Sequence, residues 1–412
     1  MKITDVEAFH INPRLASRNV GQKPRFVKID TQTVYKITTD NGIVGYGDCR
    51  GHYNLADEIR KKLIDHNPFE FVNGSWSSGL MGALYDVMGK HVELPAYRLM
   101  GQKLRDRVPV AAWTRPASPE DLAAEVIRAA NEGYSIFKMH TCSYYDVLEQ
   151  HRAVEEVAPP GFLMHYDFNH NRTMASVTRL IGQLEKSPFV GFIEDPMRWQ
   201  DLEGWRTLRQ KTNLPIVMHV PQLGGGPEII HGCADLYMVG ESGLDTALQR
   251  GYACGQANLS TVIQMTGGTL CKALAMHLGA VLPNVSHSIN LDDQYEEDVT
   301  GVRIEVAEGS SPVPEEPGLG VSVDESEFER IAENPETELP RYITCMRLPR
   351  GGTHTMVGWP NVDSVTGFAE GNIRAIRIDV EDDDGSDRFD VLYKKLEKEG
   401  PQFLNPNEST TK

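Results

Sequence analysis

The chain has 412 residues, of which 40% are hydrophobic and 24% are charged, and its formal net charge is −17. This composition is typical of globular proteins, and the length predicts one large, barrel-sized domain together with a smaller one. The strong negative charge argues against nucleic acid or an anionic membrane as a partner, and it means that an anionic substrate would need local positive charge.

Residues 1–108 predict a small α+β domain. Three segments alternate between apolar and polar residues as strands do: residues 6–10, 33–38 and 43–46. The sequence Asp40-Asn41-Gly42 supplies a tight turn between the last two, so we expect a hairpin there. Helices are expected at 54–65 and 79–99, the second with apolar residues on one face.

Two loops of this domain, residues 13–25 and 48–53, are rich in Arg, Lys, Asn and Gly. They are either solvated turns or a lid over a binding site. In the second case an arginine could meet a substrate carboxylate, and the candidates are Arg14, Arg18, Arg25 and Arg50.

From residue 109 the pattern changes to strands that alternate with helices. A strand at 108–113 is followed by a helix at 119–133, for which Ser118 is a suitable N-cap. Further strands are expected at 215–218, 234–239, 260–264 and 285–291. Together with the central segments described next, these are seven or eight strand–helix units, which predict a barrel over residues 109–317.

The centre of the barrel, residues 137–196, contains three short apolar segments that each end in polar residues. These polar residues are Lys138 and His140, then Asp167 and Asn169, then Glu194 and Asp195. Helical stretches at 143–157 and 174–184 separate the segments, so the strands should be parallel. Because the carboxyl ends of parallel barrel strands face one mouth, we predict an active site there.

Residues 318–412 are expected to return to the capping domain and to carry an extension, with a helix at 324–333 and a disordered tail at 401–412. The chain has no run of 18 apolar residues and no signal-peptide pattern at its start. Its six cysteines show no CxxC spacing. We therefore expect a soluble, cytoplasmic protein with reduced thiols.

Several segments together resemble the enolase superfamily, in its mandelate racemase and muconate-lactonizing branch. They are VYKITTDNGIVGYGD, ALYDVMGKHVELPAYRLMGQKLRDRVPV, FKMH, DFN, FIEDP, LAMHLGAVLPN and PGLGVSVDE. The resemblance implies an N-terminal α+β capping domain, or lid, over a modified TIM barrel of the (β/α)7β type. It also implies a Mg²⁺ ion and removal of the proton next to a substrate carboxylate.

The resemblance also implies roles for individual residues. Asp167 and Glu194 match the first two metal ligands. Lys138 matches the first lysine of a Lys-x-Lys pair, and His140 stands where the second lysine, the base, would be. An imidazole there is chemically suitable because its pKa lies near 7, so either residue could be the base. The alternative for His140 is a hydrogen-bonded structural histidine.

The sequence departs from the family pattern at three strand ends. The third acidic ligand is absent after strand five, where His219 is the candidate instead, so the ion could be weakly bound Mg²⁺, Mn²⁺ or another divalent ion. Gly240 and Gln264 stand where racemases carry a second base. His287 is either an acid or a core histidine, and Asn169, Asp195, Gln264 and Arg50 are expected to be minor groups of the site.

We therefore expect a metal-dependent lyase or isomerase that acts on a small-molecule carboxylate. Because a second base is missing, dehydration of a hydroxy acid or sugar acid is favoured. The alternatives are a racemase or epimerase, and a non-catalytic or metal-free divergent member. A homo-oligomer is also expected, because residues 342–348 and 373–380 are apolar enough to need cover by the lid or another subunit.

Overall fold

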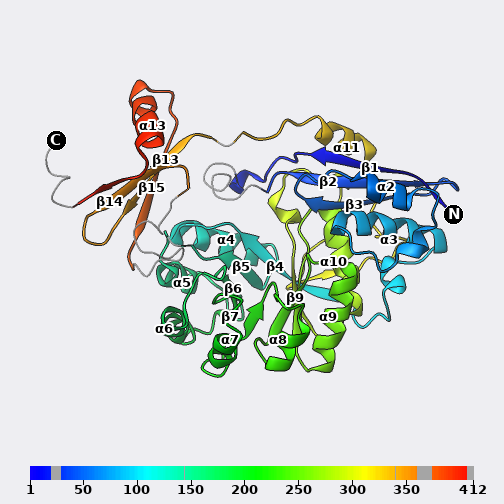
Figure 1. The fold of residues 1–412 in the computed structure, drawn as a ribbon, viewed down its shortest axis with the longest axis horizontal. Helices are drawn as coiled ribbons and strands as arrows, with labels where there is room; N and C mark the ends of the chain where they lie inside the picture. Colours follow the sequence, from blue (N-terminus) through cyan, green and yellow to red (C-terminus); the bar gives the residue numbers. More distant parts are fainter. Residues whose placement is uncertain (20–28, 143, 339, 360–373, 406–412) are drawn as a thin grey trace.

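The computed structural model describes residues 1–19, 29–142, 144–338, 340–359 and 374–405. Three sheets organise this part of the chain: an N-terminal one, a large closed one in the middle and a C-terminal one at the far side (Figure 1). Among the described residues, no helix has both the length and the apolar character needed to cross a membrane.

The N-terminal sheet is antiparallel and is made of β1 (Ile3–Ile11), β2 (Gln32–Thr39) and β3 (Val44–Arg50). The helices α2 (Asp57–Leu63) and α3 (Ser78–Val92) belong to the same domain. Gly47 lets β3 approach α3 closely, since a Cβ there would lie 2.2 Å from the carbonyl oxygen of Gly79. The predicted hairpin is β2–β3, but the expected helix at 79–99 ends at Val92, because Glu93 is left-handed (φ +56°) and Pro95 follows.

The middle sheet is a closed barrel of parallel strands in sequence order, with β11 paired to β4. The strands are β4 (Arg107–Thr114), β5 (Ile136–His140), β6 (Leu163–Asp167), β7 (Val190–Glu194), β8 (Ile216–Met218), β9 (Leu236–Gly240), β10 (Ser260–Gln264) and β11 (Val285–Ile289). The predicted (β/α)7β barrel with an N-terminal α+β capping domain is therefore confirmed.

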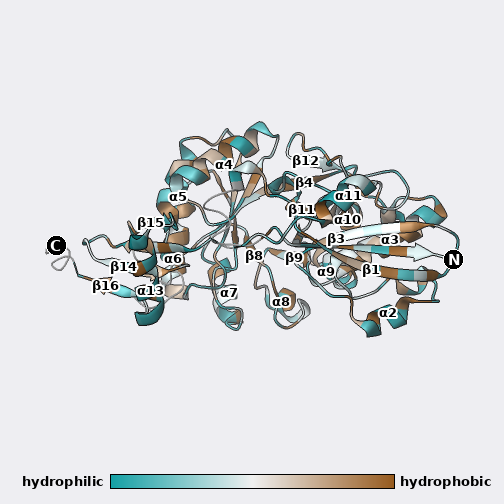
Figure 2. Cartoon of the chain, turned by 90° about the horizontal axis from the view of Figure 1, so that it is seen from above, coloured by the Kyte–Doolittle hydropathy of each residue, from teal (hydrophilic) through white to brown (hydrophobic). Residues whose placement is uncertain are grey.

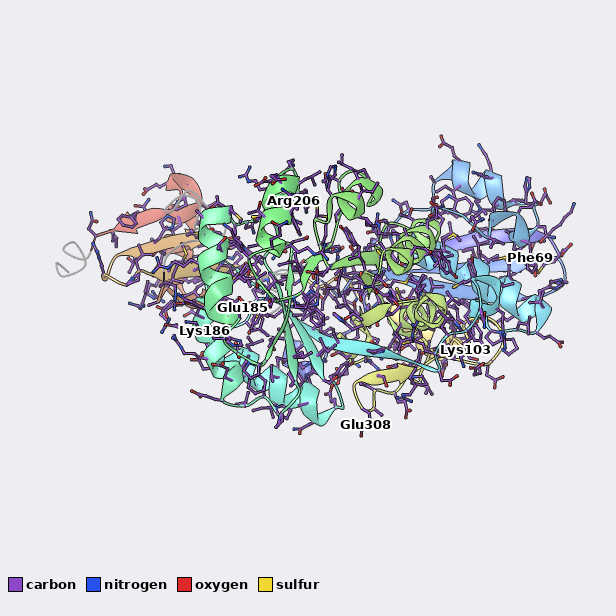
Figure 3. All side chains as sticks on the ribbon, turned by 90° about the horizontal axis from the view of Figure 1, so that it is seen from below. Phe69, Lys103, Glu185, Lys186, Arg206 and Glu308 are labelled. Atoms are coloured by element: carbon purple, nitrogen blue, oxygen red, sulfur yellow. The ribbon has the colours of Figure 1, made fainter. Side chains whose placement is uncertain are left out.

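Helices follow the barrel strands and cover the outside of the barrel. They are α4 (Pro119–Asn131), α5 (Val147–Glu155), α6 (Met174–Leu184), α7 (Leu202–Arg209), α8 (Gly226–His231), α9 (Leu244–Gln256) and α10 (Thr269–Val281). Ser118 caps α4 as predicted, because its side chain accepts the backbone N–H of Asp121. Polar and apolar stretches alternate along these helices (Figure 2). Exposed residues include Arg206 of α7 and Lys186, two residues after the end of α6 (Figure 3).

The helix α10 connects the barrel to the capping domain, and every one of its residues is buried. The carboxylate of Asp48, at the end of β3, accepts the backbone N–H groups of Gly268 (2.8 Å) and Cys271 (2.7 Å) at the start of this helix. Two residues later, the backbone N–H of Arg50 donates to the Thr266 carbonyl at 2.8 Å. The capping domain is thus fixed so that Arg50 lies at the carboxyl ends of the barrel strands.

The chain after the barrel divides into two parts. β12 (Ser310–Pro312) pairs with β4, and α11 (Glu325–Ala332) contacts β1 of the capping domain. The C-terminal sheet is separate, in the order β15 (Arg377–Asp382), β13 (Tyr342–Arg347), β14 (Thr353–Val357) and β16 (Gln402–Leu404), and it lies with α13 (Asp387–Glu399) on the α5 side of the barrel (Figure 1).

This arrangement corrects two sequence expectations. Within the expected disordered tail, Gln402–Leu404 pairs with β14, and only residues 406–412 lie outside the described part. The apolar strands do not depend on the lid for cover. Ile343 packs with Phe389 and Leu396 of α13, while Met346 and Met356 pack against the loop after β5. Homo-oligomer formation stays a prediction.

Candidate active site

The side chain of Lys138 lies at the centre of the predicted site and is fully buried. Its Nζ is 2.8 and 2.9 Å from the two carboxylate oxygens of Glu194, 3.2 Å from Asp167 Oδ2 and 2.9 Å from Gln264 Oε1. Strand register explains the convergence, because Asp167 and Glu194 are paired at the ends of β6 and β7. The sequence-predicted residues of three strands therefore do meet in one ion cluster.

Lys138 and Glu194 stay ionised despite their burial. Burial lowers the pKa of the Lys138 ammonium, but the carboxylates of Glu194 and Asp167 outweigh this effect and raise it. Burial likewise raises the pKa of Glu194, and the opposing effect of Lys138, with hydrogen bonds from His165 and His219, brings it well below the ordinary glutamate value. A lysine held in this way is not a free base.

His140 is placed differently, because its side chain is 28% exposed and lines a cavity at the barrel mouth. Its Nδ1 lies 3.1 Å from Asn169 Oδ1 and 3.4 Å from Asp167 Oδ2. Donation from Nδ1–H to these oxygens leaves Nε2 as the proton acceptor. Burial lowers the pKa of His140, so the imidazole is neutral near pH 7 and has the form that a general base requires.

The opposite side of the mouth contains His219, Glu241 and Gln264. His219 Nδ1 is 3.0 Å from Glu194 Oε1, and its Nε2 is 3.0 Å from Glu241 Oε2. Gln264 Nε2 donates to Glu241 Oε1 at 2.9 Å. Burial lowers the pKa of His219, yet its hydrogen bonds to Glu194 and Glu241 raise it to about 10. Burial raises the pKa of Glu241, but the hydrogen bond from His219 lowers it to about 2.

The sequence interpretation missed Glu241. The chain leaves β9 through Gly240, whose φ is +117° and where a Cβ would lie 2.6 Å from the Gln264 carbonyl oxygen. This turn requires glycine and brings the next side chain to the mouth. The sequence does contain a signal for Glu241, because it is a polar residue directly after a strand end. The same signal indicated Asp195 after β7.

His287 does not reach the mouth, which corrects its assignment as a candidate acid. It is fully buried two residues before the end of β11. Its Nε2 lies 2.9 Å from Nδ1 of His165, and His165 Nε2 lies 2.7 Å from Glu194 Oε2. Burial lowers the pKa of both imidazoles. The two histidines form a support beneath the carboxylates, and His165 is a second residue that the sequence interpretation missed.

Asp195 and Asn169 shape the strand ends. Both residues are left-handed, with φ of +45° and +50°, a conformation that Asp and Asn tolerate better than most residues. Asp195 Oδ1 accepts the backbone N–H of His219 at 3.0 Å, and its Oδ2 pairs with His170 Nε2 at 2.8 Å. Burial raises the pKa of Asp195 to about 6. Asp195 thus holds the His219 backbone in place.

The donor set of Asp167, Glu194 and His219 fits a divalent cation, because one ligand atom from each residue lies within 4.8 Å of the others. Glu241 holds the second ring nitrogen of His219, as carboxylates commonly do for metal-bound histidines. Two carboxylates and one imidazole suit Mn²⁺ better than Mg²⁺, which prefers oxygen ligands. The Lys138 ammonium competes with the ion for the same carboxylates.

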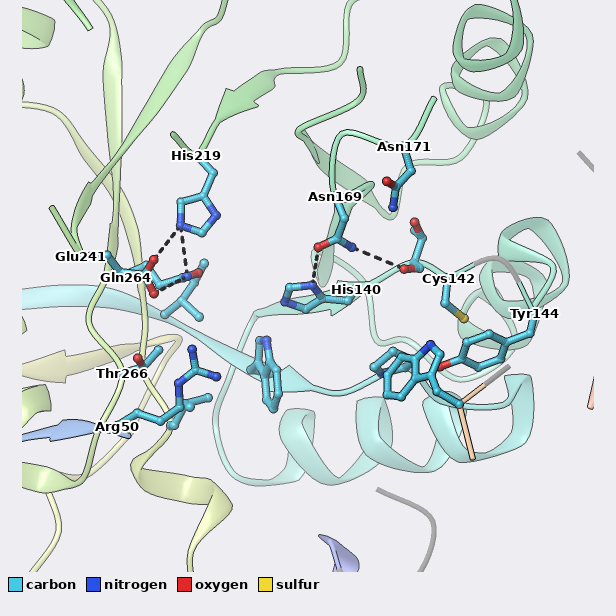
Figure 4. A pocket seen from close by; sticks show the side chains of 16 residues that line it. Arg50, His140, Cys142, Tyr144, Asn169, Asn171, His219, Glu241, Gln264 and Thr266 are labelled. Carbon is cyan, nitrogen blue, oxygen red and sulfur yellow. Dashed lines mark hydrogen bonds and ion pairs between the residues drawn. The ribbon is translucent and has the colours of Figure 1, made fainter. Parts of the chain in front are cut away.

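The cavity above the cluster has a volume of about 420 Å³, which is within the range of small-molecule sites. Figure 4 shows Arg50, Thr266, Gln264, Glu241 and His219 at one end, and Asn171, Cys142 and Tyr144 at the other. Of the candidate lid arginines, Arg50 lines the cavity, Arg14 pairs with Glu297 at 2.6 Å and Arg18 pairs with Asp293 at 3.0 Å. Arg25 lies outside the described residues.

Residues 121–222 and 232–327 match a family model described as "Enolase C-terminal domain-like". A D-galactonate dehydratase of Variovorax paradoxus is 24% identical over 394 residues, covering 81% of this chain and 95% of that relative. Another, from Verminephrobacter eiseniae, is 25% identical over 250 residues; this match covers 52% of the chain and only 60% of the relative's own length.

A solved structure, the N-succinyl Arg/Lys racemase of Bacillus cereus, is similar to the chain with a TM-score of 0.68 at 21% identity. The match covers 81% of this chain and 99% of that one. At this identity the likeness shows the shared fold. The C-terminal sheet begins at Tyr342, beyond the last residue that the family model matches.

Proposed function

Because the chain belongs to the enolase superfamily, with the mandelate racemase and muconate-lactonizing enzymes, we propose that it removes the proton next to the carboxylate of a small-molecule substrate. The reaction we favour is the dehydration of a hydroxy acid. Relatives of the chain are named as dehydratases and as racemases, so both reaction types occur among proteins similar to it.

The chemistry requires a strong positive field at the substrate carboxylate. A proton beside a carboxylate is very weakly acidic, and its removal leaves an enolate with two negative charges. A divalent ion, Mg²⁺ or Mn²⁺, would be held by Asp167, Glu194 and His219 and would supply Lewis-acid stabilisation of that charge. Arg50, which lines the same cavity, orients the anionic end of the substrate.

The observation that carries this proposal is the contrast between His140 and Lys138. The Nδ1 of His140 is held 3.1 Å from Asn169 Oδ1 while the ring lines the cavity. Lys138 is fully buried, is engaged by Glu194, Asp167 and Gln264, and is not among the described residues that line the cavity. Of the two base candidates, His140 is therefore the one that can reach a substrate.

The residues across the cavity from His140 favour removal of a proton from one face of the substrate only. Both carboxylate oxygens of Glu241 are engaged, one by His219 and one by Gln264, so Glu241 is not poised to take a proton. In the dehydration, His140 takes the α-proton, the C–O bond at the β-carbon breaks, and the imidazolium returns the proton to the departing hydroxyl, which leaves as water. One group on one face is enough for this reaction, whereas racemisation needs groups on both faces. Racemisation is the alternative, and Glu241 would have to give up these hydrogen bonds to act as the second group.

A metal-free member of the family is the second candidate, and the position of Lys138 favours it. The ammonium already neutralises the carboxylates that would hold an ion. Addition of EDTA and then of Mn²⁺ separates the two candidates, because a metal-dependent enzyme loses and regains its activity.

The test of the proposed function is deuterium exchange from D₂O into the α-position of both enantiomers of a panel of 2-hydroxy acids and sugar acids. We expect exchange into one enantiomer only, and loss of that exchange by at least about 100-fold in His140→Ala, since a general base contributes about 10²–10⁴-fold. The control is His231→Ala, which removes an exposed histidine in the last turn of α8. Equal exchange into both enantiomers, or full exchange in His140→Ala, would refute the assignment.

A further inference from the structure

The C-terminal sheet contributes a residue to the active-site cavity. Trp359, two residues after the end of β14, lines the same cavity as His140. Its indole ring meets the ring of Tyr144 edge to face, with centroids 5.9 Å apart and planes at 86°. The sheet lies outside the part of the chain shared with the family model, so this wall is an addition to the barrel.

The sheet is also fastened to the loop that follows the proposed base. This loop starts directly after His140 and runs to α5. Its Cys142 and Tyr144 form one buried cluster with Met346, Met356 and Ile376 of the C-terminal part. At the end of the loop, Asp146 Oδ2 accepts from Arg374 Nε at 2.6 Å and from the backbone N–H of Ala375 at 3.0 Å. The loop conformation beside the base therefore depends on the sheet.

The cavity has two chemically distinct ends. Charged and hydrogen-bonding groups gather at one end, with Arg50 and Glu241 (Figure 4). Among the described residues, the other end presents the aromatic rings of Tyr144 and Trp359 beside Cys142. Its amides are Asn171 and Asn169, and Asn169 Oδ1 already lies 3.1 Å from His140 Nδ1. Hydroxyl groups buried against aromatic rings without hydrogen-bond partners would cost binding free energy. A polyhydroxylated chain is therefore a poor match for this end.

We propose that the C-terminal sheet is a specificity element, and that Trp359 and Tyr144 select carboxylate substrates whose distal group is flat and apolar, such as an aromatic ring. This inference rests on the proposed function for the position of the carboxylate end. It replaces the sugar acids in the expected substrate range with aryl-substituted hydroxy acids.

The test compares 3-phenyllactate, lactate and D-gluconate in isothermal titration calorimetry of the full-length, Mn²⁺-supplemented protein. Wild type should bind 3-phenyllactate at least about tenfold more tightly than the other two, a difference of about 1.4 kcal/mol, because its ring would be buried against the rings of Trp359 and Tyr144. Trp359→Ala should abolish most of this preference, and Trp359→Phe should retain it.

The matched control is Phe403→Ala. Phe403 belongs to the same sheet, where it pairs with His354 near the start of β14, whereas Trp359 follows the end of that strand. Phe403 is 49% exposed. Its replacement should leave the preference unchanged. Equal or tighter binding of D-gluconate by wild type, absence of binding by 3-phenyllactate, or a preference that survives in Trp359→Ala would overturn the inference. Selective binding of 3-phenyllactate without exchange of its α-proton would refute the proposed function and leave this inference standing.

Discussion

The replacement of Lys138 by methionine tests how the centre of the site is balanced. Methionine fills a similar volume but removes the ammonium that lies 2.8–3.2 Å from the carboxylate oxygens of Glu194 and Asp167. Without metal, the two buried carboxylates lose their shared cation, and the removal of one partner from a buried ion pair typically costs about 3–5 kcal/mol. Lys138→Met without metal should therefore unfold at clearly lower temperature than wild type.

The same change should strengthen metal binding. A like charge about 4 Å away, at an effective dielectric constant of about 20, opposes a unit charge by ~4 kcal/mol. Recovery of even a third of this energy would tighten metal binding about tenfold. Since an ion present at 100 times its Kd adds about 2.7 kcal/mol to stability, the Mn²⁺-induced rise in melting temperature should be larger in Lys138→Met than in wild type.

The assay is thermal unfolding with EDTA and with a series of Mn²⁺ and Mg²⁺ concentrations. Lys272→Met is the matched control, because Lys272 is also a buried lysine, paired with Asp292 at 2.9 Å, and is not part of the ion cluster. It should lose stability without any change in the metal response. A metal-induced shift in Lys138→Met that is no larger than in wild type would refute the reasoning that the ammonium competes with the ion.

Two further predictions concern the carboxylates of the fold. Asp167→Asn and Glu194→Gln should each abolish the Mn²⁺-induced rise in melting temperature, and a rise that persists in both variants would remove these residues from the metal site. Burial raises the pKa of Asp48 to about 8, and the nearby Asp298 carboxylate makes a smaller contribution in the same direction. The folded state therefore holds the Asp48 proton more tightly than the unfolded state does. The stabilisation that results is fully present below about pH 4 and is lost as the pH rises toward 8. Asp48→Asn should show a weaker fall in melting temperature between pH 5 and pH 8, and an unchanged fall would show that Asp48 is not its source.

The barrel and the core of the site could be predicted because they depend on local patterns. Each of the strands β5, β6 and β7 is a short apolar segment that ends in a polar residue. Parallel pairing then fixes where these ends meet, so the meeting of Lys138, Asp167 and Glu194 could be predicted without any knowledge of side-chain direction. The capping hairpin followed in the same way from its alternation and its turn.

Three features could not be derived from such patterns. The approach of Glu241 depends on the positive φ of Gly240, and sequence does not specify the direction in which the chain leaves a turn. The depth of His287 depends on where β11 ends, and a shift of two residues along a strand moves a side chain from the mouth into the interior. The position of Trp359 depends on packing between segments more than 200 residues apart.

The two-residue repeat of a strand also explains why the site has layers. Lys138 and His140 point to the same side of β5, as His165 and Asp167 do on β6. The inner member of each pair is fully buried and donates to a carboxylate at the mouth, as Lys138 does to Glu194 and Asp167 and His165 does to Glu194. The inner layer therefore fixes the carboxylates, and the outer layer faces the substrate.

The summed charge of the ion cluster and the cavity mouth favours the proposed divalent ion over the metal-free alternative. Six side chains of the ion cluster and the cavity mouth decide the balance of charge. Three are carboxylates and three are nitrogen groups that can carry positive charge: Asp167, Glu194, Glu241, Lys138, Arg50 and His219. With His219 protonated the set is neutral, so a bound carboxylate would leave a net negative site in a protein whose net charge is already −17. With a divalent ion and a neutral His219 as its ligand, the set carries one positive charge, and a substrate carboxylate brings it to neutrality. The enolate of the proposed reaction would therefore be better stabilised with the ion than without it.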